Sequence, residues 1–158
     1  QEVKEANASG AEIAISFHIN AGGGDGFEVY HFGSSAKGKK LAALCEKHVK
    51  TLGQNSRGIK IGDHLYFIKK TKMTAILVES FFLDNTKDKT IGDSIAEQTA
   101  FGVAYAKAIL EYLSIPYKSM SPDSTKLYKV QVGAYDNKAN AEVMAKKVKS
   151  AGFDAIIV

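Results

Sequence analysis

The sequence predicts an α/β fold in which a mixed, mostly parallel sheet is covered by helices on both faces. Residues 11–20 and 75–79 are apolar on both faces of a predicted strand, which is typical of strands that lie between two layers of helices. Residues 39–52 and 91–113 repeat apolar side chains at helical spacing. A chain of 158 residues has room for one such domain and a small additional module.

Composition and charge are those of an ordinary globular protein. Hydrophobic residues make up 45% of the chain, charged residues 24%, and the formal net charge is +4. No apolar run is long enough to insert into a membrane, and no basic stripe alternates with aromatic residues as a nucleic-acid partner would require. The single cysteine, Cys45, lies in an apolar helical stripe and is interpreted as a buried free thiol. We expect a monomer.

The chain opens with a segment that has the pattern of a helix end. Residues 1–8 are predicted to be helical, and Ser9 and Gly10 close them, but no capping residue or hydrophobic staple precedes them. A globular domain rarely begins with the last turns of a helix and continues directly into its central strand. We therefore expect that part of this domain precedes residue 1.

Residues 11–20 are predicted to form that central, buried strand. Odd-numbered side chains face one side of the strand, and even-numbered ones, among them His18, face the other. Three glycines at 22–24 end the strand after Asn20. In sheets of this class the reactive crevice lies outside the carboxyl ends of the strands. His18 and Asn20 are therefore candidate site residues.

A second apolar strand, residues 75–79, ends in a single carboxylate, Glu79. Ionised carboxylates are rarely buried without a partner or a metal. His18 and Glu79 can therefore belong to one shared site. The alternative is structural: His18 as a hydrogen-bonded core histidine, and Glu79 paired with a lysine.

The segments between these strands are assigned from periodicity. Residues 27–32 alternate as a strand, with His31 at the far end and interpreted as a surface residue. Residues 39–52 form a helix in which His48 lies at the edge of the apolar stripe with a satisfied partner. Residues 54–60 are predicted to be a polar loop that carries Arg57, and residues 65–68 a short strand.

The helix at 91–113 is followed by Pro116 and a polar linker at 117–126. Its predicted buried stripe consists of Ile95, Thr99, Gly102, Val103, Ala106, Ile109, Leu110 and Leu113. A separate small α+β unit at 127–158 then begins with an alternating strand over 127–133. Asn137 is a plausible N-cap for a short helix, Gly152 closes that helix, and residues 153–158 begin another strand. One face of this helix is lined by Ala141, Met144, Ala145 and Val148.

Four motifs in the first 113 residues resemble, in order and spacing, the zinc-dependent N-acetylmuramoyl-L-alanine amidases of the amidase type 3 family. They are Ser16-Phe17-His18-Ile19-Asn20-Ala21, Gly26-Phe27-Glu28-Val29-Tyr30, Arg57-Gly58, and Leu77-Val78-Glu79-Ser80-Phe81-Phe82-Leu83-Asp84-Asn85. One departure is Phe81, which stands where family members often have a small residue. The unit at 127–158 resembles the first half of a SPOR (sporulation-related repeat) domain through Tyr128–Tyr135, Asn140-Ala141-Glu142 and Gly152-Phe153.

The resemblance implies a peptidoglycan hydrolase that cleaves the amide between N-acetylmuramic acid and the L-alanine of the stem peptide. It implies Zn as cofactor with His18 as one ligand, and Glu79 as the catalytic acid and base. Asn20, Arg57 and Asn85 would bind substrate. Asn20 could equally cap the turn after its strand, Arg57 could be a solvated charge, and Asn85 corresponds to an asparagine that fixes its loop. The SPOR-like unit implies binding to the glycan strands of peptidoglycan.

Two zinc ligands of the family, a histidine and a glutamate on earlier elements, have no counterpart in this sequence. Domain limits of 1–116, 117–126 and 127–158 are therefore expected to enclose the later part of an amidase, a linker and a partial SPOR-like unit. With one ligand recognisable, the 158-residue polypeptide is expected to be weakly active or inactive. The implied location is the bacterial cell wall or the extracellular space, or the host wall for a phage enzyme.

Two other functions stay open from the residues alone. One is a non-catalytic protein that binds the cell wall on a degenerate amidase scaffold. The other is an unrelated zinc peptidase, which would need a complete ligand set within these residues. The histidines 18, 31, 48 and 64 have no HExxH or similar spacing, which argues against the peptidase.

Overall fold

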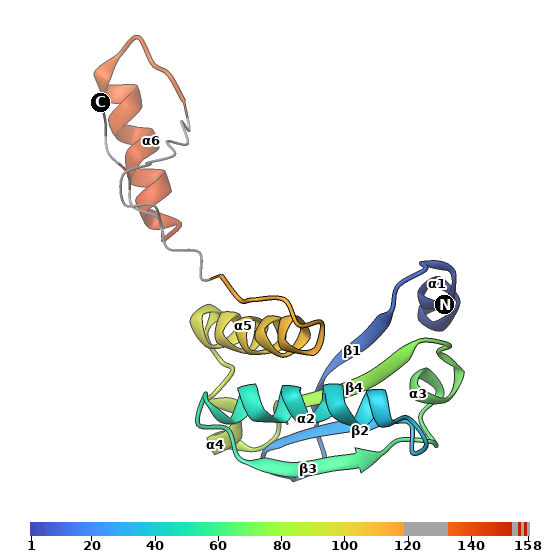
Figure 1. The fold of residues 1–158 in the computed structure, drawn as a ribbon. Coiled ribbons are helices and arrows are strands. Elements are labelled where there is room, and N and C mark those ends of the chain that lie inside the picture. Colours follow the sequence, from blue (N-terminus) through green and yellow to red (C-terminus); the bar gives the residue numbers. More distant parts are fainter. Residues whose placement is uncertain (119–132, 153–154, 156, 158) are drawn as a thin grey trace. The chain divides into compact units, whose positions relative to one another are not determined.

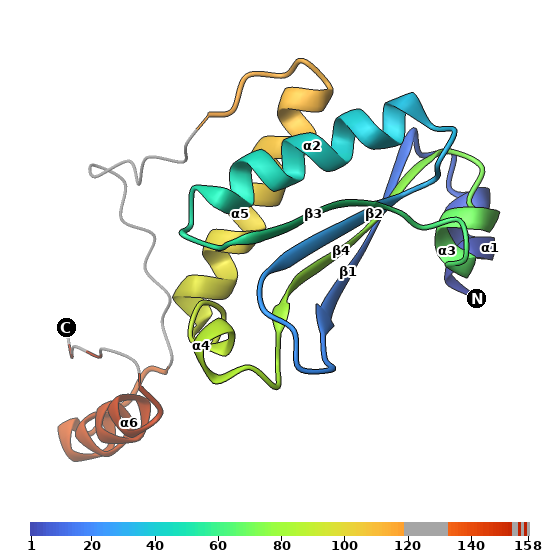
Figure 2. The same ribbon diagram turned by 90° about the horizontal axis from the view of Figure 1, so that it is seen from below.

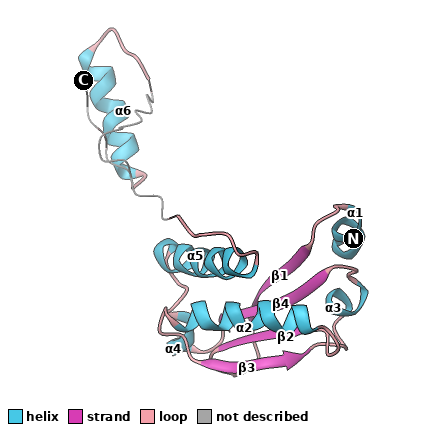
Figure 3. Cartoon of the chain, in the orientation of Figure 1, coloured by secondary structure: helices cyan, strands magenta, loops and turns pink. Residues whose placement is uncertain are grey.

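A computed structural model describes residues 1–118 and 133–152, together with residues 155 and 157. The chain divides into two compact units, Gln1–Lys118 and Ser119–Val158, which are described separately. Figure 1 shows the elements of both units, and Figure 3 distinguishes their helices from their strands. None of the helices in these described segments has the length and apolar content that are needed to span a bilayer.

The first unit is built on one four-stranded sheet with the strand order β1-β4-β2-β3. Strand β1 pairs in parallel with β4, β2 pairs in parallel with β3, and the central β2–β4 pair is antiparallel. The predicted mixed, mostly parallel sheet is thus confirmed. The strands are β1 (Ile13–Asn20), β2 (Phe27–His31), β3 (Ser56–Ile61) and β4 (Thr74–Phe82).

Helices pack on both faces of this sheet, as expected. On one face, α2 (Ala36–Lys50) and α5 (Ile95–Tyr112) lie over the strands and against each other. On the other face, α3 (Tyr66–Lys70) packs on the first half of β4. Figures 1 and 2 show α3 beside α1 (Glu2–Ala8) at one end of the sheet and α4 (Thr86–Lys89) at the opposite end.

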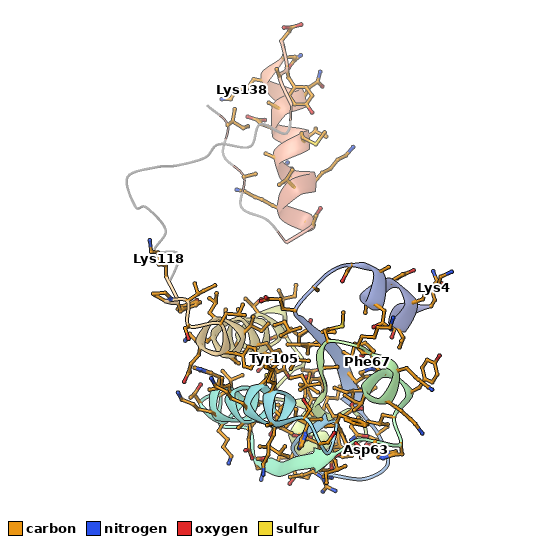
Figure 4. The ribbon with its side chains drawn as sticks, turned by 45° about the vertical axis from the view of Figure 1, so that its right-hand side comes forward. Lys4, Asp63, Phe67, Tyr105, Lys118 and Lys138 are labelled. Carbon is orange, nitrogen blue, oxygen red and sulfur yellow. The ribbon has the colours of Figure 1, made fainter. Side chains whose placement is uncertain are left out.

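The main core lies between the sheet and the helices α2 and α5. Tyr105 is part of this core, and Phe67 on α3 belongs to the smaller cluster on the opposite face (Figure 4). Glu111 on α5 joins the two helices at the surface, because it accepts hydrogen bonds from Lys47 Nζ at 2.7 Å and contacts His48 Nε2 at 2.7 Å. The prediction of a partner for His48 is therefore confirmed. The side chains that are buried most completely are Phe27, Val29, Leu41, Cys45, Val49, Ile76 and Val78.

Cys45 lies inside the main core, as predicted, and burial raises the pKa of its thiol to about 12. The thiolate is the form that reacts with electrophiles. We expect the native protein to react with an aromatic disulfide reagent at pH 8 about 10³-fold more slowly than the protein in 8 M urea, because three pKa units remove that fraction of thiolate. Equal rates in the two solvents would contradict a buried Cys45.

Strand β1 corrects the prediction of a buried central strand. It lies at the edge of the sheet in the described part of the chain, and none of its residues is buried. Phe17 is 55% exposed and Ile19 is 54% exposed. An apolar composition on both faces therefore predicted the strand correctly but not its depth, because burial depends on which elements cover the strand.

Helix α5 buries a different face from the predicted stripe. Its buried residues are Phe101, Ala104, Tyr105 and Ala108, whereas Ile95 of the predicted stripe is 83% exposed. Three other stripe residues, Gly102, Ala106 and Ile109, line an open groove of about 740 Å³ beside Phe17 and Ile19. The helix is thus apolar on two faces, and periodicity alone did not show which of them meets the sheet.

Three further assignments were wrong in type or burial. Residues 56–61 are the edge strand β3, because backbone pairing with β2 forms a strand that lacks an apolar alternation. Residues 65–68 contribute to helix α3, since a short apolar run does not distinguish a strand from a helical turn. His31 is buried, not at the surface, and its Nδ1 lies 2.8 Å from the carbonyl oxygen of Phe32.

The second unit contains one helix within the described residues, α6 (Lys138–Ser150). The Asn137 side chain accepts a hydrogen bond from the backbone N–H of Ala139, which confirms the predicted N-cap. Gly152 follows the helix with a φ of +88°, a conformation that suits glycine. The predicted strand at 127–133 lies almost wholly outside the described residues. Of residues 153–158 only 155 and 157 are described, and neither is assigned to a strand. Ala141, Met144, Ala145 and Val148 are less exposed than most of their neighbours on α6.

Candidate functional site

His18 and Glu79 lie side by side on adjacent strands, in register across the β1–β4 pair. Glu28 on β2 continues the same row, because it is the register partner of Glu79 on its other side. Strands β1 and β4 approach their carboxyl ends here, whereas β2 begins here. The sheet therefore brings together the two predicted residues and one carboxylate that the prediction did not assign to the site.

Glu79 is the member of this row with an unsatisfied side chain. Its Oε2 atom is buried and has no hydrogen-bond partner among the described residues. Desolvation by burial raises the pKa of the Glu79 carboxyl, His18 opposes this shift, and the charge of Glu28 adds to it. The structural alternative, in which a lysine neutralises Glu79, is not what the structure shows, because the ion pairs of the described residues do not include Glu79.

His18 is exposed, and its Nε2 atom lies 2.7 Å from the Ser16 hydroxyl oxygen. Catalytic zinc usually takes three protein ligands and keeps one open position. Within the part of the chain that the structure describes, no three His, Cys, Asp or Glu side chains are grouped as such a site requires. These donors therefore do not form a catalytic zinc site by themselves, although His18 is available as a single ligand.

Glu28 is 3% exposed and is surrounded by donors. Arg57 Nε donates to its Oε1 atom, and Lys60 Nζ lies 2.6 Å from the same oxygen. The Tyr30 hydroxyl donates to Oε2 at 2.7 Å, and Asn20 Nδ2 lies 3.4 Å from it. Desolvation raises the pKa of Glu28, but Lys60, Arg57 and Tyr30 together lower it to about 2. Glu28 is thus a fully ionised, fully partnered carboxylate beside an unpartnered one.

Glu28 lies in one of the four family motifs, but the sequence analysis assigned it no role. Glu79 was identified as the single carboxylate of an apolar strand, and Glu28 is likewise the single carboxylate of the predicted strand at 27–32. Tyr30 lies two residues after Glu28 on the same face of β2, so the alternation of the strand already places it there. Lys60 has no such signal, because only the pairing of β2 with β3 brings it to Glu28. The same pairing moves Arg57 from the predicted loop into a strand, with its guanidinium 5.3 Å from the centre of the Phe82 ring.

The ionised Glu28 predicts a pH dependence of stability. Because its folded-state pKa of about 2 lies below the usual 4.5, its stabilising contribution is complete above pH 4.5 and is lost as the pH falls toward 2. We expect Glu28→Gln to remove up to about 3 kcal/mol of this acid-dependent stability, measured by urea unfolding between pH 2.5 and 7. The control Glu12→Gln changes an exposed carboxylate. Parallel pH profiles for wild type and Glu28→Gln would contradict the prediction.

The glycine segment after β1 is fixed by the segment after β4. Both Gly22 and Gly23 donate their N–H groups to the Asp84 carboxylate at 2.8 Å. Asn85 Nδ2 donates to the Gly24 carbonyl at 2.9 Å, and the Asn85 Oδ1 atom caps α4. A Cβ atom at Gly24 would lie 2.3 Å from the Phe82 ring, so any other residue here would have to displace that ring. The turn next to His18 thus has a defined conformation.

Asp88 completes this attachment from inside the protein. Its carboxylate is 3% exposed and accepts hydrogen bonds from Gly26 N at 2.9 Å, from Gln54 Nε2 at 2.6 Å and from Phe82 N. One buried side chain therefore ties the start of β2, the end of β4 and the loop before β3 together. These are the segments that carry Glu28, Glu79 and Arg57.

The predicted substrate-binding residues have structural partners in this arrangement. Asn20 Oδ1 accepts from Ala21 N at 2.8 Å, which caps the turn after β1. Asn85 fixes its loop, as proposed from its motif, and Arg57 contacts Glu28. Contacts of Asn20, Arg57 and Asn85 with a substrate stay predictions. Chemically, the row offers a carboxylate with a raised pKa and one oxygen that has no hydrogen-bond partner among the described residues, which is suited to proton transfer.

Comparison with known sequences agrees with this geometry. Residues 1–111 match the family described as N-acetylmuramoyl-L-alanine amidase, and residues 123–158 match the SPOR domain. An N-acetylmuramoyl-L-alanine amidase of Bacillus licheniformis is 32% identical over 160 residues, which cover 100% of this chain and 61% of that protein. An endolysin of Bacillus phage SPP1 is 36% identical over 126 residues, and this match covers 73% of this chain and 45% of the endolysin.

Solved structures show the same similarity. The catalytic domain of an N-acetylmuramoyl-L-alanine amidase from Bacillus (Paenibacillus) polymyxa var. colistinus matches with a TM-score of 0.65 and 29% identity. That match covers 72% of this chain and 64% of the solved one. The chain thus spans about three fifths of the length of the Bacillus relatives that it matches over nearly its whole length.

Proposed function

We propose, since the chain belongs to the N-acetylmuramoyl-L-alanine amidase family, that the protein hydrolyses the amide between N-acetylmuramic acid and the L-alanine of the peptidoglycan stem peptide. The observation that carries the proposal is the row of His18 and Glu79 in register, with a buried Glu79 oxygen that has no protein partner among the described residues. A carboxylate in this state can accept a proton from a reacting molecule.

In the proposed reaction, Glu79 takes a proton from the attacking water and passes it to the nitrogen of the leaving amine. Its raised pKa favours both steps, because a carboxylate that is more basic than usual removes a proton more readily and still returns it near neutral pH. Glu28 stays ionised throughout, since its partners lower its pKa to about 2. Glu79 and Glu28 therefore have different roles although they are neighbours.

Zinc is the cofactor that the family resemblance implies, and we propose His18 as one of its ligands. The described residues supply no group of three donors, so a complete zinc site would need donors in addition to those grouped here. Asn20, Arg57 and Asn85 are proposed to contact the substrate from the strands and loops that border the row.

The second unit is proposed to bind the glycan strands of peptidoglycan. Its sequence matches the SPOR domain, and we propose limits of 1–116 for the amidase part, 117–126 for the linker and 127–158 for the SPOR-like part. The protein would act as a monomer in the bacterial cell wall or the extracellular space, or on a host wall if a phage encodes it.

A second function is favoured by one observation. The incomplete donor set around His18 is also what a non-catalytic protein would have if it bound the wall on an amidase scaffold. Such a protein would bind peptidoglycan and release nothing from it.

Release of new amino termini from purified peptidoglycan separates the two functions. The assay compares samples with and without added zinc, for the 158-residue chain and for any longer natural form of the protein. Release of stem peptides with an L-alanine amino terminus is the result expected for an amidase, and it is expected to be weak for the 158-residue chain. Sedimentation of the protein with the wall and no release in any sample would favour the binding function.

A further inference from the structure

The ion pairs on Glu28 combine two positive charges with one negative charge. Arg57 and Lys60 both contact the same oxygen of this carboxylate, so two cations surround one anion. Side-chain exposure is 42% for Arg57 and 34% for Lys60, against 4% for Glu28. The buried carboxylate thus fixes two cationic side chains that remain accessible from solvent. Asp25 also interacts electrostatically with Arg57, although no hydrogen bond joins the two.

Arg57, the single arginine of the sequence, is oriented by two contacts. Its Nε atom donates to Glu28, and its guanidinium lies 5.3 Å from the centre of the Phe82 ring. Its two terminal nitrogens form no hydrogen bond to any residue that the structure describes. A planar guanidinium with two free nitrogens is suited to bidentate recognition of a carboxylate.

The position of Arg57 in the sheet relates it to the reacting group. Glu28 lies one strand away from Glu79, and β3, which carries Arg57, lies one strand further. Neighbouring strands are about 4.8 Å apart, so the backbones at Glu79 and Arg57 are separated by roughly 10 Å. An extended peptide covers about 3.5 Å per residue, so this separation corresponds to about three residues.

We propose that Arg57 and Lys60 form a subsite for an ionised carboxylate on the second or third residue of the stem peptide, with Glu28 as the positioning residue. This inference rests on the proposed function, because the distance is counted from Glu79 as the group beside the cleaved amide. The subsite thus pairs Arg57 and Lys60 with a carboxylate of the substrate that lies about three residues from the cleaved amide.

Binding of two matched ligands tests the subsite. One ligand is a muramoyl tripeptide whose second and third residues carry free carboxylates, and the other is the same molecule with carboxamides in their place. Both are titrated calorimetrically into the 158-residue chain that carries Glu79→Gln, so that the ligand is not cleaved. We expect the carboxylate ligand to bind about 10- to 100-fold more tightly, as hydrogen bonds to charged groups would give.

Four variants in this background locate the preference. Arg57→Gln is expected to abolish it, and Lys60→Gln to reduce it. Lys87→Gln, at an exposed lysine on α4, is the matched control and is expected to leave it unchanged. Arg57→Lys, which keeps the charge without the planar fork, is expected to give an intermediate preference. Urea unfolding of each variant shows whether the fold is retained. An intermediate carboxylate preference in a folded Arg57→Lys protein could not be explained by loss of the fold.

Equal affinity for the two ligands, or no binding of the carboxylate ligand, would overturn the subsite. A preference that persists in Arg57→Gln would also overturn it. The peptidoglycan release assay is independent of these results. Release without a carboxylate preference would refute the subsite alone, whereas a preference without release from any form of the protein would refute the hydrolase and leave a carboxylate site on a protein that only binds the wall.

Discussion

Replacement of Glu79 by glutamine is expected to lower the rate of stem-peptide release from peptidoglycan by about 10²- to 10⁴-fold, the usual contribution of a general acid and base. Glutamine has nearly the same size and keeps a carbonyl oxygen, but it cannot take a proton from water. Since Glu79 Oε2 has no hydrogen-bond partner among the described residues, no protein contact that the structure describes at this oxygen is lost. The measurement is the rate at which new amino termini appear in purified peptidoglycan, made on a longer natural form of the protein because the 158-residue chain is expected to be weakly active.

Two controls define the interpretation of the Glu79 result. Glu12→Gln alters an exposed glutamate just before β1 and is expected to retain the wild-type rate. Urea unfolding of Glu79→Gln should show no loss of stability, because desolvation disfavours the charged form of Glu79 in the native protein. A Glu79→Gln protein that is folded and as active as wild type would refute the assignment of Glu79 as the proton-transfer group.

Replacement of Asp88 by alanine is expected to destabilise the first unit by about 3–5 kcal/mol, because three buried donors lose a charged acceptor at once. These donors are Gly26 N, Phe82 N and the side-chain amide of Gln54. A loss of this size is a large share of the 5–15 kcal/mol that typically stabilises a domain. The measurement is the free energy of unfolding in urea at pH 7.

The Asp88 result has a matched surface control and a graded variant. Asp93→Ala removes an exposed carboxylate that is 3.9 Å from Lys89 Nζ, and a surface pair of this kind contributes about 0.5 kcal/mol or less. Asp88→Asn keeps one acceptor oxygen and should lie between the alanine variant and wild type. If Asp88→Ala and Asp93→Ala were equally stable, the described role of Asp88 would be wrong.

The different outcomes for the strands show what local pattern can determine. Strands β1 and β4 were predicted because their residues form short runs that are apolar on both faces. Strand β3 was predicted to be a loop because its residues are mostly polar. It is a strand only because β2 offers its backbone groups as partners, and a pattern in one segment does not contain that information.

The candidate site divides in the same way. Glu79 could be identified because a lone carboxylate in an apolar strand is costly unless it has a function or a partner. Glu28 has the same local pattern, yet only the structure separates the two, since Glu28 has four polar neighbours and the Glu79 Oε2 atom has none among the described residues. Asp88 had no signal at all, because its donors come from segments that are distant in sequence.

The sequence by itself determined the α/β class, the positions of His18 and Glu79 near the ends of two apolar strands, the buried thiol of Cys45 and the N-cap of α6. These features depend on the periodicity and chemistry of short segments. Tertiary structure alone decided the exposure of β1, the buried face of α5 and the ionisation of Glu28. Burial and pKa are set by the groups that surround a side chain in space, and those groups come from strands and helices that the local sequence does not specify.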